Sequence, residues 1–242
     1  MTDPEQAGRA EVLRGLHGAP EILVLVNAWD VASARAIVTA GGKAVATASH
    51  SVAAAHGYPD GEHLPRELAL AALARVCAAV DVPVTADLES GYGDAGHTAR
   101  LALEAGAVGC NLEDRRAPLG DAARAVAAVV AAGTAAGVPL VVNARTDAFL
   151  LAGPDEPRAS LVAEAVQRGR AYAAEGADCV FVPGVTDRET IQALVAGLGG
   201  VALSVLGGPG APPAAELQAL GVARVSYGPW VMRVALGAVS AA

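Results

Sequence analysis

The feature that most limits how this chain can fold is the regular alternation of short apolar runs with segments of helical pattern. The apolar runs are rich in valine, isoleucine and alanine and predict buried strands. They lie at 22–27, 44–48, from 84 onward, and at 108–112, 139–144, 179–182, 201–205 and 223–226. Continuous apolar strands that alternate with helices indicate a parallel sheet covered on both faces.

Helices are expected between these strands and before the first of them. Their predicted ranges are 4–17, 31–40, 65–80, 95–105, 120–136, 157–175, 188–196, 213–220 and a last helix from about Pro229. The stretch Ser49–His63 is predicted to be a long loop. Eight strand–helix units in one chain of 242 residues predict a single α/β domain over residues 1–242, a (β/α)₈ TIM barrel with a short N-terminal helix.

The alternative architecture is an open doubly wound sheet. That fold would favour a G-x-G-x-x-G turn after the first strand. The chain has Asn27-Ala-Trp-Asp30 there instead, so the barrel is preferred.

Composition narrows the classes of partner and compartment. The chain is 53% hydrophobic and only 17% charged, which allows a large core, and its net charge of −8 with no basic run argues against nucleic acid and anionic membranes. The N-terminus is polar, and we expect no apolar run of the roughly 18 residues that cross a membrane. Cys77, Cys110 and Cys179 lie far apart in apolar surroundings, which indicates core packing in the reducing cytoplasm.

Polar residues follow the carboxyl ends of successive predicted strands. They are Asn27 and Asp30, Ser49 and His50, Asp87 and Glu89, Glu113 and Asp114, and Arg145 and Asp147. In a (β/α)₈ barrel these ends form one rim, on which active sites are built. The pattern therefore predicts one site rather than scattered surface polarity.

The centre of this pattern is Val84-Thr-Ala-Asp-Leu-Glu-Ser-Gly-Tyr-Gly93. If the strand continues to Glu89, the side chains of Asp87 and Glu89 point to one face, because the side-chain period of a strand is two residues. Two adjacent carboxylates repel each other unless a cation or a shared proton lies between them. A hard ion such as Mg²⁺ is expected, and the alternative is a strand end with two solvated acids.

Further candidates extend this site. Glu113 and Asp60 could add carboxylates, mostly through water, since Mg²⁺ takes one or two directly. The planar guanidinium of Arg145 suits a substrate carboxylate, although a structural salt bridge to Asp147 or Glu113 is the alternative. Ser49 and His50 could donate hydrogen bonds to an anion, or His50 could be a surface residue. Mg²⁺ with an arginine fits a 2-oxo acid that reacts through an enolate.

Six motifs together resemble the isocitrate lyase/phosphoenolpyruvate mutase superfamily. They are Asn27-Ala-Trp-Asp30, Gly57-Tyr-Pro-Asp60-Gly, Asp87-Leu-Glu-Ser-Gly-Tyr-Gly93, Gly109-Cys-Asn-Leu-Glu-Asp114, Asn143-Ala-Arg-Thr-Asp147 and Phe181-Val-Pro-Gly184. The resemblance implies a (β/α)₈ barrel, Mg²⁺ (or Mn²⁺), a small 2-oxo acid or dicarboxylate substrate, and a homo-oligomer, dimer or tetramer, with an exchanged C-terminal helix.

The resemblance also implies roles for single residues. Asp87 would bind the metal directly, and Asp60, Glu89 and Glu113 through water. Substrate contacts would come from the group Ser49, His50, Arg145, Asn27 and Trp29, and the catalytic groups would be Arg145, Glu113 and His50.

The loop after Glu113-Asp114 departs from the family. The lyases carry a Lys-x-Cys-Gly-His motif there, with the catalytic cysteine, whereas this chain has Arg115-Arg-Ala-Pro-Leu-Gly120. We therefore expect a Mg²⁺-dependent lyase or hydrolase that cleaves a C–C or P–C bond, resembling an oxaloacetate decarboxylase or a phosphonopyruvate enzyme. The alternative is a barrel that binds a small carboxylate without turnover.

Overall fold

The computed structural model describes residues 3–241, in which nine parallel strands form one sheet. Its order is β1-β9-β8-β7-β6-β5-β4-β3-β2. The strands are β1 (Leu23–Leu25), β2 (Asn27–Ala28), β3 (Val45–Thr47), β4 (Val84–Asp87), β5 (Gly109–Glu113), β6 (Val141–Arg145), β7 (Cys179–Val182), β8 (Ala202–Leu206) and β9 (Arg224–Ser226).

The predicted first strand is split into β1 and β2, which accounts for the ninth strand. β1 pairs with β9, and β2 pairs with β3. Only Val26 separates these two pieces, so the two edges of the sheet meet along one stretch of chain. The prediction of a (β/α)₈ TIM barrel is confirmed, since an all-parallel sheet closed in this way needs no further strand.

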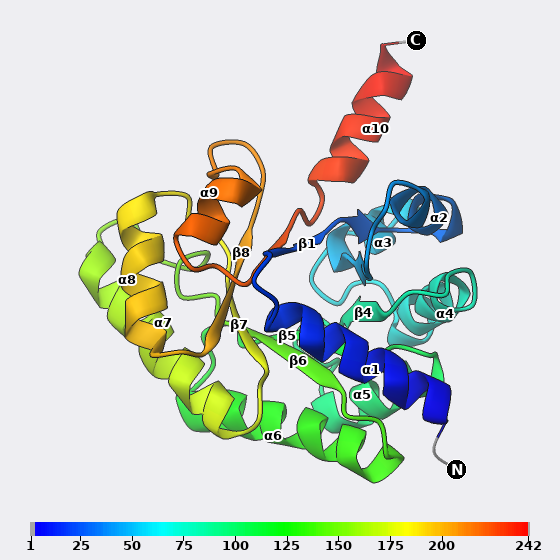
Figure 1. Cartoon of the computed structure of the whole chain (residues 1–242), viewed down its shortest axis with the longest axis horizontal. Coiled ribbons are helices and arrows are strands. Elements are labelled where there is room, and N and C mark those ends of the chain that lie inside the picture. The colour runs from blue at the N-terminus through cyan, green and yellow to red at the C-terminus, as the bar shows by residue number, and fades with distance from the viewer. Residues whose placement is uncertain (1–2, 242) are drawn as a thin grey trace.

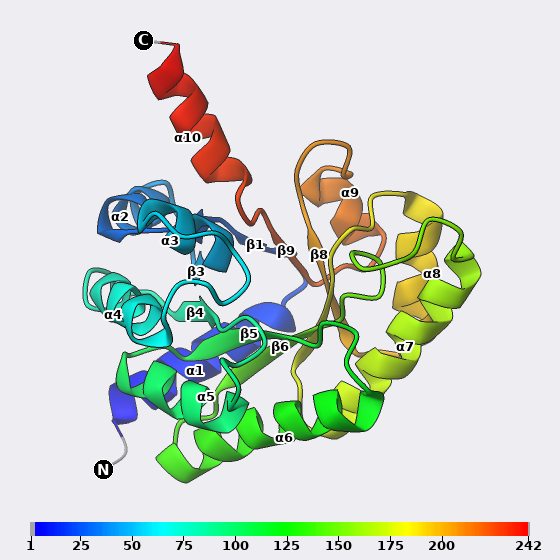
Figure 2. The ribbon, with the colours of Figure 1, turned by 180° about the vertical axis from the view of Figure 1, so that it is seen from behind.

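Helices surround this sheet (Figures 1 and 2). They are α1 (Pro4–His17), α2 (Val31–Thr39), α3 (Ser49–Ala55), α4 (Arg66–Cys77), α5 (Ala95–Glu104), α6 (Leu119–Ala136), α7 (Arg158–Ala174), α8 (Arg188–Leu198), α9 (Ala214–Ala219) and α10 (Trp230–Ser240). The prediction of a loop over Ser49–His63 is wrong in its first half, because α3 begins at Ser49. Burial of Val52 and Ala53 against Leu64 and Trp29 stabilises that helix.

The first helix closes the N-terminal end of the barrel. Leu13 reaches the space where Gly109 has no side chain, and a Cβ atom at Gly109 would lie 2.6 Å from Leu13 Cδ2. Arg14 binds Asp178 at 2.7 Å and the Pro139 carbonyl at 2.9 Å, both of which precede strands. The opposite, carboxyl end of the strands is therefore left for a site.

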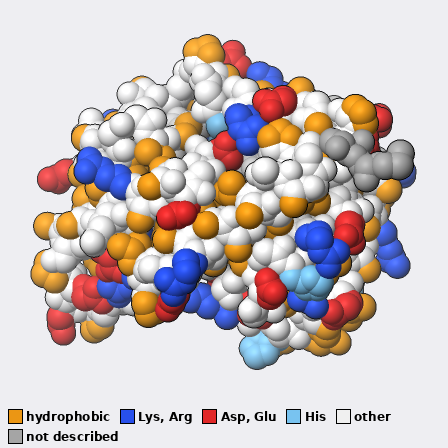
Figure 3. All heavy atoms as spheres, turned by 90° about the horizontal axis from the view of Figure 1, so that it is seen from below, with side chains coloured by type: hydrophobic (Ala, Val, Ile, Leu, Met, Phe, Trp, Pro, Cys, Tyr) orange, Lys and Arg blue, Asp and Glu red, His pale blue; other side chains and the backbone are white. Residues whose placement is uncertain are grey.

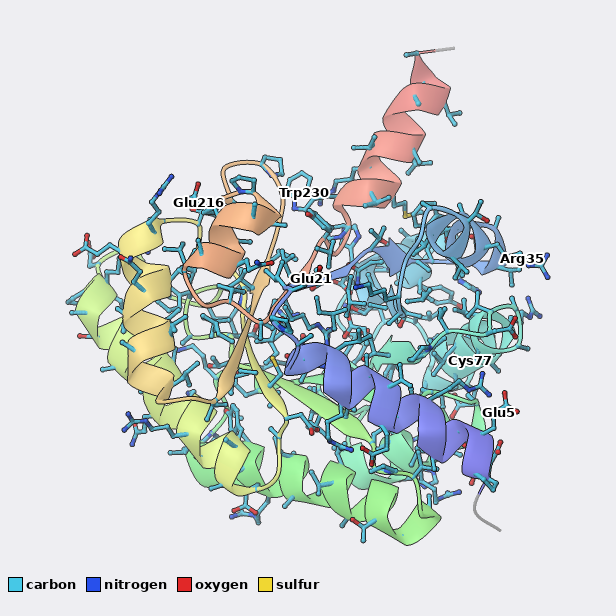
Figure 4. All side chains as sticks on the ribbon, viewed as in Figure 1. Glu5, Glu21, Arg35, Cys77, Glu216 and Trp230 are labelled. Carbon is cyan, nitrogen blue, oxygen red and sulfur yellow. The ribbon has the colours of Figure 1, made fainter. Side chains whose placement is uncertain are left out.

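The cysteines lie in or beside the core as predicted. Cys110 and Cys179 are buried, and burial raises the pKa of each thiol to about 12. Cys77 is half-buried on α4 (Figure 4). All three are free thiols, and the protonated form of a buried thiol is unreactive.

Helix α6 is long and apolar enough to cross a membrane by length and composition alone, contrary to our expectation. Its alanine-rich sequence explains this result, since alanine is apolar by hydropathy yet favours helices of every kind. In the fold α6 lies along the barrel and buries Val126 and Val129. The surface over α6, viewed from below in Figure 3, has charges of both signs among apolar side chains.

The last helix, α10, projects away from the barrel (Figures 1 and 2). Trp230 stands at its base (Figure 4), where it packs so closely on Gly208 that a Cβ atom there would lie 2.5 Å from the indole nitrogen. Beyond this contact, Val234, Leu236 and Val239 are 73%, 53% and 73% exposed. Exposed apolar side chains around a projecting helix are a usual mark of a contact with another chain.

Candidate active site

The predicted polar residues gather at the carboxyl ends of neighbouring strands. Asp87 is the last residue of β4, Glu113 the last of β5 and Arg145 the last of β6. Glu113 is paired in register with Arg145, and Asp87 with Asn111, two residues before Glu113. Because the strands are parallel and adjacent, their last side chains border one space at the rim.

Asp87 is held by main-chain groups on two sides. Its Oδ2 accepts a hydrogen bond from the Ser49 N–H at 2.9 Å, and its Oδ1 accepts one from the Glu89 N–H at 3.3 Å. The Asp87 N–H donates to Thr47 Oγ1 at 2.9 Å. These bonds fix the orientation of the carboxylate and leave lone pairs on both oxygens for a further partner.

Glu89 reaches the same place by a different route from the one predicted. β4 ends at Asp87, and Glu89 has a left-handed backbone with φ of 50°, so the expected strand geometry is wrong. Its carboxylate is nevertheless only 3% exposed. Burial, followed by repulsion from Asp87, Asp60 and Glu113, raises the pKa of Glu89 to about 7. The cluster therefore carries more negative charge than its own cations offset.

Glu113 and Arg145 form an ion pair, and Arg145 Nη1 lies 2.8 Å from Glu113 Oε2. Arg145 Nε lies 2.6 Å from Asp147 Oδ1. The structural salt bridges considered as an alternative for Arg145 are both present. They occupy Nε and Nη1 of its planar fork. Burial raises the pKa of Glu113, against the opposing effect of Arg145.

Glu62 and Arg115 also belong to the cluster, and the sequence alone did not assign them to it. Glu62 accepts hydrogen bonds from the Ser90 N–H, the Ser90 hydroxyl and the Tyr92 N–H at 3.1, 2.7 and 2.8 Å. Arg115 reaches Glu113, Glu89 and Glu62. The only sequence signal for Glu62 is its position two residues after Asp60, within a loop whose path cannot be read from sequence.

Backbone strain concentrates in the same loops. Five non-glycine residues of the described chain have positive φ, and all border this cluster: Glu62, Glu89, Tyr92, Arg115 and Arg116. Such conformations cost free energy and persist where surrounding contacts enforce them, which is typical of functional sites.

The other predicted residues have varied surroundings. Asn27 is buried, and its side chain bonds the Thr47 carbonyl and the N–H groups of Tyr227 and Gly228, so it ties the barrel seam together. Trp29 packs on the small cluster beside α3. His50 lies in the first turn of α3 rather than in a loop, and its Nδ1 is buried with no hydrogen-bond partner in residues 3–241.

The donor set suits a hard divalent ion, because it consists of carboxylate oxygens with uncompensated charge. Asp60 is exposed, yet it lies near enough to raise the pKa of Glu89. Within residues 3–241 no three His, Cys, Asp or Glu side chains already converge as a ready-made cage. An ion here would therefore take few direct protein ligands and keep several waters, as Mg²⁺ prefers.

Comparison with known proteins agrees with this geometry. A family model described as phosphoenolpyruvate phosphomutase matches residues 13–242. The chain belongs to this family. The structure of a candidate phosphonomutase from Burkholderia cenocepacia has a TM-score of 0.92 and 40% identity, over 98% of this chain and 97% of that one.

Named relatives of this family member carry out several reactions. The Corynebacterium glutamicum protein named probable 2-methylisocitrate lyase 2 is 32% identical over 254 residues, 97% of this chain and 79% of the relative. The 2,3-dimethylmalate lyase of Eubacterium barkeri is 28% identical over 88% of this chain and 77% of its own length. An oxaloacetate decarboxylase of Bradyrhizobium is 33% identical over 50% of this chain and 44% of its own length. The superfamily thus comprises enzymes that act on small 2-oxo acids and related dicarboxylates.

Proposed function

We propose that this family member is a Mg²⁺-dependent lyase or hydrolase that cleaves a C–C or P–C bond of a small 2-oxo acid through an enolate. The supporting observation is the cluster of Asp87, Glu89 and Glu113 beside Arg145 and Arg115, in which negative charge exceeds that of the two guanidiniums. Mn²⁺ has the same preference for oxygen ligands and could replace Mg²⁺.

Asp87 is proposed as the direct metal ligand, since its carboxylate is oriented by two N–H groups and is free of any arginine. Asp60, Glu89 and Glu113 would hold the ion through water. A bound Mg²⁺ would supply a Lewis acid beside the oxo group, where negative charge develops as the bond breaks.

The chain's own groups would bind and orient the acid. Arg145 can donate to a substrate carboxylate from Nη2, while Asp147 and Glu113 hold its guanidinium at Nε and Nη1. Ser49 and His50 begin α3, whose first N–H bonds Asp87 at this rim, and their side chains are proposed to bind the acid. Glu113 is held between the two arginines, with Oε1 on Arg115 and Oε2 on Arg145, and is proposed as a catalytic group at this rim.

Decarboxylation of an oxaloacetate-like acid fits the departure in the loop after β5. Arg115–Pro118 contains no cysteine, lysine or histidine. Loss of CO₂ yields an enolate directly and requires no acid/base at that loop until the enolate is protonated. Relatives named oxaloacetate decarboxylase match about half of this chain, and relatives named lyase match more of it, so this branch rests on the sequence of the loop.

The test is pyruvate release from a panel of 2-oxo and 2-hydroxy acids, with and without Mg²⁺. We expect release from a short dicarboxylic 2-oxo acid that ceases when the metal is chelated. Release that persists in excess chelator would contradict the metal-dependent mechanism.

A second candidate is a barrel that binds a small carboxylate without turnover, favoured by the same missing lid residues. It predicts Mg²⁺-dependent thermal stabilisation by oxalate with no product from any acid. Absence of both turnover and stabilisation would exclude both candidates.

We also propose that the chain assembles as a homo-oligomer by exchange of α10. A groove of about 550 Å³ opens beside β1, where Val24 on the outer face of the barrel is 38% exposed, and Ile37 and Val231 border it. The exposed apolar side chains of α10 match this groove in chemistry. The mass in solution tests this: Val234→Asp should convert a dimer or tetramer to monomers, whereas an unchanged mass would exclude the exchange.

A further inference from the structure

The loop between β5 and α6 consists of Asp114 followed by a tight turn of four residues, Arg115–Pro118. The first two residues of this turn, Arg115 and Arg116, have left-handed backbones with φ of 46° and 51°. The Ala117 N–H donates to the Asp114 carbonyl at 2.7 Å, and the Arg116 N–H donates to Asp114 Oδ1 at 2.9 Å. The turn is therefore built on Asp114 and has little freedom to move as a flap.

Arg116 anchors this turn to the neighbouring helical layer. Its guanidinium lies 2.8 Å from both carboxylate oxygens of Glu156 and 2.6 Å from Glu164 Oε2. A further bond joins it to the Leu151 carbonyl at 3.1 Å. Bidentate arginine–carboxylate pairs fix geometry as well as charge, so Arg116 holds the turn while Arg115 extends over the cluster.

Arg115 contacts three glutamates that come from three different segments. Its Nε lies 2.9 Å from Glu113 Oε1, while its Nη atoms lie 3.4 Å from Glu89 and 3.5 Å from Glu62. The two Nη contacts are longer than the 2.7–2.9 Å typical of a strong charged hydrogen bond. Its side chain is 39% exposed, against 3% for Glu89. The Nη groups are thus the most accessible donors in the cluster.

Arg115 and Arg145 flank one carboxylate from opposite sides. Arg115 binds Glu113 Oε1, and Arg145 binds Glu113 Oε2. A ligand with two anionic groups on a short chain could therefore contact one arginine with each group. Such a ligand would otherwise be repelled by the acids of the site and by the net charge of −8.

We propose that Arg115 is a specificity-determining residue that binds a second, distal anionic group of the substrate, while Arg145 binds the carboxylate next to the oxo group. This inference rests on the proposed function. The shared chemistry is a 2-oxo acid with a terminal anion three or four atoms away, and a carboxylate and a phosphonate are its two possible forms. A 2-oxo acid with an uncharged end would gain nothing from Arg115.

The test compares ligands of equal length that differ in the distal charge, measured by calorimetry with Mg²⁺ present. The dianionic probe is 3,3-difluorooxaloacetate, and the probe with an uncharged end is 3,3-difluoro-2-oxobutanoate; fluorine removes the C3 protons of both. In a separate arm, phosphonopyruvate is the dianion and is compared with the same uncharged probe. We expect wild-type protein to bind a dianion at least about tenfold more tightly than the uncharged analogue, the effect of one charged hydrogen bond. The arm with the larger ratio identifies the form of the anion.

Arg115→Ala should reduce this ratio to near one by weakening the dianion, with binding of the uncharged probe nearly unchanged. Arg115→Lys should retain part of the preference, since it keeps the charge and loses the planar fork. Arg124→Ala, on the exposed face of α6, is the matched control and should keep the wild-type ratio. Arg115→Gln replaces the alanine variant if thermal unfolding shows that the latter does not fold.

An unchanged ratio in Arg115→Ala, or equal weakening of both probes, would overturn the assignment while leaving the proposed function intact. If no acid is turned over but the probes bind with the expected ratios, the proposed catalysis fails and the role of Arg115 stands. If wild-type protein binds neither probe, both fail.

Discussion

Glu113 and Asp114 are neighbours in sequence and face opposite sides of the barrel wall. Asp114 lies under the helical layer, where Tyr172 donates its hydroxyl at 2.6 Å and Arg168 lies 3.2 Å away. The N–H groups of Arg116 and Asp147 complete its partners. Glu113 lies at the rim, where it pairs with Arg115 and Arg145, and there burial, together with the nearby Asp87 and Asp147, raises its pKa.

The difference separates a structural acid from a functional one. A buried carboxylate whose partners are all supplied by the fold has no capacity left for a ligand. At the rim the acids Glu62, Asp87, Glu89 and Glu113 outnumber Arg115 and Arg145, so that group requires an added cation or proton. Each prediction below tests whether a polar group belongs to the first class or to the second.

The largest effect on stability is expected for Asp114→Ala. This change removes one of the two acids that pair with the buried Arg168, the other being Glu164, and leaves the Tyr172 hydroxyl and the N–H groups of Arg116 and Asp147 without their acceptor. The free energy of unfolding in urea should fall by about 3–5 kcal/mol, as for other broken buried pairs. A loss below about 1 kcal/mol would mean that Asp114 is not part of the structural class.

Asp87→Ala should have the opposite profile. Removal of one acid from a repelling cluster should change the free energy of unfolding little, while Mg²⁺-dependent binding of oxalate should fall at least about 100-fold, as when a principal ion contact is lost. Calorimetry measures this binding, and Asp114→Asn provides a comparison in which the cluster is intact. Unchanged Mg²⁺ affinity would remove Asp87 as the metal ligand.

His17 tests the structural class at the other end of the barrel. Its Nδ1 lies 2.9 Å from the Leu13 carbonyl and its Nε2 lies 3.4 Å from the buried Arg224, so the neutral ring donates from Nδ1. Burial, followed by Arg224, lowers the pKa of His17 from 6.5 to about 4.

Between these two pH values the unfolded chain binds a proton that the folded chain does not. Stability should therefore fall by about 3 kcal/mol as the pH drops from 6.5 to 4. Urea unfolding across this range measures the loss, and His17→Gln should flatten the slope. An equal slope in the variant would assign the loss to other groups.

The smallest loss of stability is expected for Asp94, an exposed acid that accepts one capping hydrogen bond. Asp94 caps α5, where its Oδ1 accepts a hydrogen bond from the His97 N–H at 2.9 Å. Asp94→Ala should cost about 1 kcal/mol, the usual value of a helix cap, and leave Mg²⁺ binding unchanged. A change in Mg²⁺ affinity would mean that Asp94, although it lies outside the rim, contributes to metal binding.

Much of the fold could be predicted from the sequence, because strand and helix patterns are local and an alternating series of them has few closed solutions. The units around β4 to β9 lie within a few residues of their predicted ranges. The errors arose where tertiary contacts outweighed local pattern. Burial of Val52 and Ala53 turned an expected loop into α3, and closure of the barrel split the first strand at Val26.

The sequence by itself determined that acids and one arginine would follow successive strand ends, since chain order and a parallel sheet bring those ends together. The sequence could not determine which of these side chains take all their hydrogen-bond and ion-pair partners from the protein itself. The partners of each side chain depend on contacts between residues that are 26 to 58 positions apart in sequence, such as Arg115 with Glu89 and Tyr172 with Asp114. Only the tertiary structure separated Glu113 from Asp114, and Arg115 from Arg116, because adjacent residues of like chemistry differ only in the side of the wall they face.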